Sequence, residues 1–149
     1  MNEMTTNLIN EVKSLETEIW ELAHNVWTLS ELSLEEQESS RLEAKYLADN
    51  DFVISDHGIG GLDFAWVATW GSGKPVIGIT VEFDALPGLG NEITTEKTPR
   101  KDGNPNGHGC GHNLIGAGAI CAAVALKNYL KKNNINATLK VFGCPAEEL

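Results

Sequence analysis

The side chains best suited to chemistry lie in two short motifs, GHGCGHN and GCPAEE. The first motif places Cys110 two residues before His112, with a glycine on each side of the cysteine that lets the backbone bend. A thiolate and a neutral imidazole are both good ligands for zinc-like divalent ions. The second motif ends in the adjacent carboxylates Glu147 and Glu148. Our hypothesis is that both motifs belong to one metal site.

Other interpretations of these motifs remain open from the residues alone. The C-x-H spacing lacks the paired cysteines and paired histidines of structural zinc sites, so it favours a buried cysteine beside a histidine that caps a helix. A Cys–His nucleophilic pair is disfavoured, because an imidazole two residues away in a tight turn cannot easily reach the sulfur as a general base. Glu147 and Glu148 could also be two solvated glutamates without a role.

The elements around the motifs favour the metal site. The apolar run after Asn113, followed by lysines, predicts a buried helix with Asn113 as its N-cap, and the helix dipole should favour the Cys110 thiolate. Apolar runs at 75–88 and 137–145 predict strands before and after this helix, and hence a βαβ unit. Ligands bind at the carboxyl edge of such sheets, which is where Glu147 should emerge beside the cysteine.

The N-terminal half shows a change of pattern. Apolar residues three or four apart over 8–26 predict an amphipathic helix. A second helix is predicted to start at Ser33, with Glu36 completing a capping box. The runs 64–70 and 76–81 flank GSGKP and predict a hairpin, whereas GSGKP does not satisfy the phosphate-loop pattern.

Composition limits the class of protein. The 149 residues suit one domain, and 42% hydrophobic with 21% charged residues is typical of a globular chain. Lys+Arg total 11 against 21 Asp+Glu, a net charge of -10, so we expect neither nucleic acid nor a membrane surface as partner. Three sparse cysteines and an N-terminus without a signal region predict a cytoplasmic protein.

Three motifs in order, VEFDALPGLG, GHGCGHN and FGCPAEE, resemble the aminoacylase/carboxypeptidase family of dinuclear metal amidohydrolases. The last two look most like the aminobenzoyl-glutamate hydrolase type, and the likeness runs through essentially the whole chain. It implies an α/β fold, with helices packed on a mixed, largely parallel sheet, as in a zinc-peptidase-like catalytic domain. It also implies cleavage of the amide bond of N-acyl or N-aroyl amino acids, or of dipeptides, by a metal-activated water.

The resemblance implies a role for each candidate residue. Cys110, His112 and Glu148 would be metal ligands, with the sulfur placed to serve two divalent ions. Zinc or manganese is expected, and cobalt or nickel is compatible with these ligands. Glu147 would be the general base, and Asp84 would support the site from behind the ligands.

Several residues near the motifs receive weaker assignments. Glu82 is interpreted as a strand residue lining the site rather than as a ligand, although related subgroups have a ligand there. His108 is expected behind the ligands or toward substrate, with an ordinary surface loop residue as the alternative. The long polar loop 91–106 is expected to be functional, or else a solvated insertion. The remaining candidates are predicted to be structural: His24, His57, Cys121 and Cys144.

The resemblance also implies that parts of the enzyme are not contained in residues 1–149. We expect 1–149 to be a truncated, N-terminal part of the catalytic domain. Two further histidine ligands, a dimerisation (lid) domain and the C-terminal part of the catalytic domain would then lie outside it, and the full-length protein would be a homodimer. The chain alone should bind metal weakly and hydrolyse little. The alternative is a non-catalytic metal-binding or interaction fragment that needs a second polypeptide.

Overall fold

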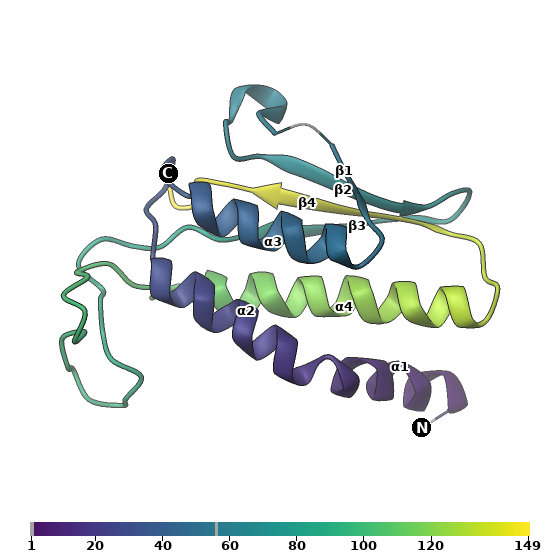
Figure 1. Ribbon diagram of the computed structural model, residues 1–149, viewed down its shortest axis with the longest axis horizontal. Coiled ribbons are helices and arrows are strands. Elements are labelled where there is room, and N and C mark those ends of the chain that lie inside the picture. Colours follow the sequence, from purple (N-terminus) through teal and green to yellow (C-terminus); the bar gives the residue numbers. More distant parts are fainter. Residues whose placement is uncertain (1, 56) are drawn as a thin grey trace.

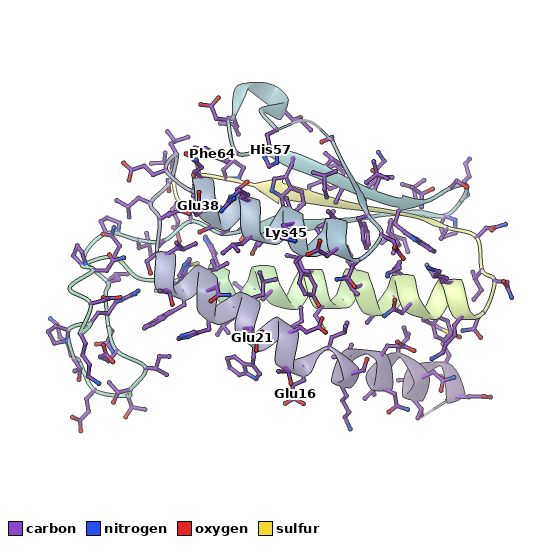
Figure 2. The ribbon with its side chains drawn as sticks, viewed as in Figure 1. Glu16, Glu21, Glu38, Lys45, His57 and Phe64 are labelled. Atoms are coloured by element: carbon purple, nitrogen blue, oxygen red, sulfur yellow. The ribbon has the colours of Figure 1, made fainter. Side chains whose placement is uncertain are left out.

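A four-stranded mixed sheet carries all four helices on one side. The computed structural model describes residues 2–55 and 57–149. Its elements are α1 (Glu3–Ser14), α2 (Glu16–Leu29), α3 (Gln37–Asp49), β1 (Val53–Ile54), a 3-10 turn (Ile59–Gly61), β2 (Trp66–Gly71), β3 (Val76–Glu82), α4 (His112–Lys132) and β4 (Thr138–Cys144). Figure 1 shows α1 and α2 farthest from the sheet, and the acidic side chains Glu16 and Glu21 of α2 point away from it (Figure 2). The predicted α/β class is confirmed.

The predicted βαβ unit is present as β3–α4–β4. Strands β3 and β4 pair in parallel, and the sheet order is β1-β2-β4-β3 with the other two pairings antiparallel. The predicted hairpin between β2 and β3 is therefore wrong, because β4 lies between them. The chain does bend at GSGKP, but burial decides which strands pair. Leu139 and Val141 on β4 are fully buried, which suits a central strand.

A glycine on β4 is required by this packing. A Cβ at Gly143 would lie 2.3 Å from the indole of Trp66, which is itself buried on the neighbouring strand. Any larger residue would have to displace the largest side chain of the core.

The N-terminal amphipathic segment forms two helices rather than one. Helix α1 ends at Ser14, and α2 begins at Glu16. Leu15 at the junction is buried in the core shared with α4, so the apolar stripe continues although the helix axis changes direction (Figure 1). Periodicity predicts the buried face, whereas the bend depends on packing against α4.

The predicted start of the second helix, and its capping box, are wrong. Helix α3 begins only after Glu36, whose side chain turns into the interior. The carboxylate of Glu31 caps the helix instead, accepting from the backbone N–H and the hydroxyl of Ser39 at 2.7 Å each. The Ser33 hydroxyl donates to Asp84 across 51 residues, at 2.7 Å. The Ser33 hydroxyl thus donates to a distant carboxylate instead of accepting from a nearby backbone N–H, as the capping box would require.

Helix α4 is the central helix of the fold. It packs against α1, α2, α3, β3 and β4. Its length and mean hydropathy of 1.3 would also suit a membrane span, but 56% of that apolar window is buried inside the protein. The predicted N-cap at Asn113 is wrong as well. Gly111 occupies that position with a left-handed φ of 88°, and Asn113 lies in the first turn, donating to the Ala23 carbonyl at 3.3 Å.

Candidate metal centre

The ends of three elements meet at one end of the molecule. Strands β3 and β4 run parallel, so their carboxyl ends lie together, and α4 begins beside them (Figure 1). The structure brings together one ligand atom each from Cys110, His112 and Glu148, all within 4.8 Å of one another. These are the three residues that the sequence nominated as ligands.

A second group shares the same histidine. Ligand atoms of Glu82, His112 and Glu147 also lie within 4.8 Å of one another. Sequence reasoning gave Glu82 only a lining position, yet the structure places it among the acidic groups. Its position could have indicated this. Glu82 is the last residue of β3 and lies opposite Cys144, the last residue of β4, shortly before the acidic pair.

The imidazole of His112 has its two nitrogens in different surroundings. The ring is 1% exposed, and Nδ1 lies 2.9 Å from Asp84 Oδ1. Nε2 faces carboxylates of Glu82, Glu147 and Glu148 at 3.5, 3.6 and 3.8 Å, which are longer than ordinary hydrogen bonds. Nδ1 is thus placed to donate to Asp84, while Nε2 faces an acidic space.

Asp84 organises the site from the interior. Besides His112, its carboxylate accepts the backbone N–H of Glu148 at 3.0 Å and the hydroxyl of Ser33 at 2.7 Å. One fully buried carboxylate therefore orients one nominated ligand by its ring and another by its backbone. Such partners set ring orientation and basicity in metal sites.

The Cys110 thiol is exposed and lies next to acid groups. The neighbouring Glu148 carboxylate is the main cause that raises the pKa of Cys110, followed by desolvation and by the charges of Glu147 and Glu82. The helix dipole is expected from the sequence to favour the thiolate, but in the metal-free chain the nearby carboxylates oppose it and raise the pKa of Cys110.

The donor set fits a divalent cation. Sulfur, imidazole nitrogen and carboxylate oxygen are the ligands of zinc-like ions. The Oε1 atom of Glu148 is buried without a hydrogen-bond partner among the described residues, and it faces His112. An orphaned carboxylate oxygen in this position is what a cation would satisfy, and the cation would also favour the thiolate.

His108 is not a member of this donor set. Its Nε2 lies 3.1 Å from the Val26 carbonyl of α2, and burial lowers the pKa of His108, which favours the neutral ring. The side chain therefore ties the GHGCGHN motif to α2.

Loop 91–106 is anchored by Arg100. This buried side chain donates to the carbonyls of Trp27 and Thr28 at 2.8 and 2.9 Å, and its guanidinium lies 4.1 Å from the centre of the Trp27 ring. The loop forms no regular element, but its position against α2 is well defined. Its functional role stays a prediction.

Comparison with known sequences gives one curated relative. No protein-family model matches the chain. The chain is 36% identical over 128 residues to a subunit of the p-aminobenzoyl-glutamate hydrolase of Escherichia coli K12, an alignment that covers 86% of this chain and 26% of that protein. The chain thus spans about a quarter of the length of this relative.

Solved structures share the fold. A protein of methicillin-resistant Staphylococcus aureus, provisionally assigned as an aminohydrolase, is 26% identical with a TM-score of 0.76, covering 97% of this chain and 36% of that one. A dinuclear metal-binding peptidase of the M20 family from Bacillus subtilis is 23% identical with a TM-score of 0.71, covering 91% and 36%. An aminobenzoyl-glutamate utilization protein of Klebsiella pneumoniae is 16% identical with a TM-score of 0.61, covering 95% and 39%.

Proposed function

We propose that the chain, which is similar to a subunit of an aminobenzoyl-glutamate hydrolase, supplies part of an active site that hydrolyses an amide bond. The observation that carries the proposal is the arrangement around His112. Asp84 holds one ring nitrogen, and the other faces the groups that the resemblance names as ligand and base.

Cys110, His112 and Glu148 would hold a divalent ion. When bound, the ion lowers the pKa of water and polarises the amide carbonyl. Glu147 is 47% exposed, against 22% for Glu148, so it is the more accessible of the two carboxylates. Glu147 accepts a proton from the water whose oxygen attacks the carbonyl carbon, and it returns the proton to the amine nitrogen as the C–N bond breaks.

The full enzyme would use two divalent ions, of zinc or manganese by preference and cobalt or nickel as alternatives. The two ligand groups share His112, whose Nδ1 is occupied by Asp84. A single free nitrogen binds one ion, so the two groups compete for the imidazole. We therefore propose that residues outside 1–149 supply further ligands, and that this chain alone binds metal weakly.

The proposed substrate is a small N-acyl or N-aroyl amino acid, aminobenzoyl-glutamate-like, or a dipeptide. The name of the curated relative supports the aminobenzoyl-glutamate class. A cytoplasmic location is proposed with it, because all three cysteines are free and an exposed thiol ligand is best preserved in a reducing compartment.

The test compares metal content after dialysis against zinc. At equilibrium with excess zinc, wild type should bind the ion weakly but measurably, Cys110→Ser should bind markedly less, and Cys121→Ala should match wild type because Cys121 is buried in the core beside α1 and α2. Equal zinc in the wild type and in Cys110→Ser would contradict the proposed site. Hydrolysis of aminobenzoyl-glutamate by 1–149 should be negligible, so a robust chelator-sensitive rate would contradict the proposed incompleteness.

The second candidate function is a non-catalytic fragment that works with another polypeptide. It is favoured by β3, which pairs only with β4 among the described residues and exposes Val76 and Ile77. The curated relative is itself named as one subunit of an enzyme. Zinc retention by the chain, with hydrolysis appearing only after a second polypeptide is added, would favour this function.

A further inference from the structure

Glu36 is a buried carboxylate to which neither the metal centre nor the helix beside it gives a role. Its exposed fraction is 0%, and it immediately precedes α3. Its side chain does not cap the helix, because Glu31 accepts from the backbone N–H groups of Glu38 and Ser39 instead. A residue needed only to fill space here would be apolar, since a buried carboxylate is costly without a partner.

The partner of Glu36 lies at the other end of the sequence. Its Oε1 accepts the backbone N–H of Ala146 at 2.6 Å, across 110 residues. Ala146 follows Pro145 at the end of β4 and has a left-handed φ of 58°. Residues with a Cβ avoid this conformation, so it persists only where other contacts hold it.

A second buried carboxylate holds the same segment two residues later. Asp84 accepts the backbone N–H of Glu148 at 3.0 Å. Glu147 lies between the two held peptides, and its carboxylate faces Nε2 of His112. The turn that carries the acidic pair is thus fixed at both ends from the protein interior.

We propose that Glu36 is a positioning residue, which holds the Ala146 peptide so that Glu147 and Glu148 face His112. The proposal rests on the proposed function for what these two carboxylates do. It differs from the role of Asp84, because the hydrogen bond of Glu36 is to the backbone of the turn, whereas Asp84 also binds the ring of His112.

The test uses the whole chain with Glu36→Met, Glu36→Gln and the matched control Glu43→Met. Glu43 is equally buried on α3, and neither of its oxygens has a hydrogen-bond partner among the described residues. Both methionine variants remove a buried carboxylate beside or within the same helix, but only one removes the contact with Ala146. Any general effect on folding should therefore appear in both.

The first measurement is amide hydrogen exchange at 146–148 without metal. Glu36→Met should accelerate exchange by about tenfold or more, and Glu43→Met should leave it near wild type. Glu36→Gln keeps a neutral and weaker acceptor, so a rise of about threefold is expected. Equal exchange in Glu36→Met and Glu43→Met overturns the proposal. If Glu36→Met does not fold, the absence of a rise in Glu36→Gln overturns it.

The second measurement is titration with Co²⁺ alone. Glu36→Met should weaken Co²⁺ binding by about tenfold or more, as is usual when residues behind the ligands are lost, whereas Glu43→Met should stay within about twofold of wild type. Faster exchange with unchanged Co²⁺ affinity overturns the positioning role alone. If wild type and Cys110→Ser both fail to bind Co²⁺ while exchange changes as expected, the proposed metal function fails and the hold of Glu36 on the turn stands.

Discussion

Asp84 and Glu43 are both buried acidic side chains, but they differ in their hydrogen-bond partners. Asp84 is surrounded by donors from Ser33, His112 and the Glu148 backbone. Glu43 has no hydrogen-bond partner among the described residues, and complete burial raises the pKa of Glu43 well above its ordinary value of 4.5. The first acid is surrounded by hydrogen-bond donors, whereas burial without a donor in the described part of the chain favours the protonated form of the second.

The raised pKa of Glu43 predicts a pH-dependent stability. In the pH range between 4.5 and the raised pKa, the folded state binds a proton that the unfolded chain has lost. Stability contributed by this group is therefore complete below pH 4.5 and declines as pH rises, with a slope of at most about 1.4 kcal/mol per pH unit. Glu43→Gln should remove the decline, so its advantage over wild type should grow from pH 5 to pH 8 in urea unfolding.

The control for this prediction is Glu38→Gln on the exposed side of α3, where Glu38 forms an ion pair with Arg41. It should change the pH dependence little, because exposed pairs contribute about 0–1 kcal/mol. If the unfolding free energies of wild type and Glu43→Gln changed with pH in parallel, the charged Glu43 carboxylate would have to be stabilised in the folded protein.

Motifs predicted the residues that meet at the site, and they did not predict the residues that hold them. Cys110, His112 and Glu148 come from short patterns at the end of a βαβ unit, whose topology brings them together. The contacts of Ser33 and Glu36 join residues 51 and 110 positions apart. Local patterns suggested a capping box for both residues. Nothing in the sequence shows which distant hydrogen-bond partner will compete with the local one.

Elements were predictable where their own pattern decides burial. The strands of the βαβ unit and the buried helix between them follow from apolar runs. The pairing of β2 does not, because it depends on β4 entering the sheet beside it. The split between α1 and α2 likewise depends on the surface of α4 against which both helices pack.

Loop 91–106 should lose its position when Arg100 is replaced. In Arg100→Met the carbonyls at the end of α2 lose their donors, which should cost about 1–3 kcal/mol in unfolding free energy. The exposed Lys97 and Lys101 should then be cleaved faster by trypsin, as followed by mass spectrometry. Arg41→Met, on the exposed side of α3, should digest like wild type. Unchanged cleavage in Arg100→Met would show that other contacts hold the loop.

The whole molecule presents an open sheet edge. Among the described residues β3 has only one neighbour, and Val76 and Ile77 on this strand are 58% and 37% exposed. An exposed apolar edge strand is a template for pairing with another chain. The net charge of -10 opposes association of like chains, so the edge should act mainly at high concentration or high salt.

We predict concentration-dependent association of 1–149, measurable by sedimentation velocity. Ile77→Lys should reduce it, because a charged side chain on an edge strand disfavours pairing. Trp20→Ser is the comparison on the helical side, where Trp20 is 62% exposed, and it should leave association unchanged. A strictly monomeric wild type at high salt would contradict the prediction, and loss of association in Trp20→Ser would assign it to the helices.

The central place of β4 has a consequence for biosynthesis. Strands β2 and β3 emerge from the ribosome long before β4, and neither can pair with β4 until that strand has been made. At about 5–20 residues per second, the 55 residues between the end of β3 and the start of β4 take several seconds to make. During this interval β3 is unpaired and β2 has only the two-residue strand β1 beside it, so apolar strand edges stay open to a chaperone.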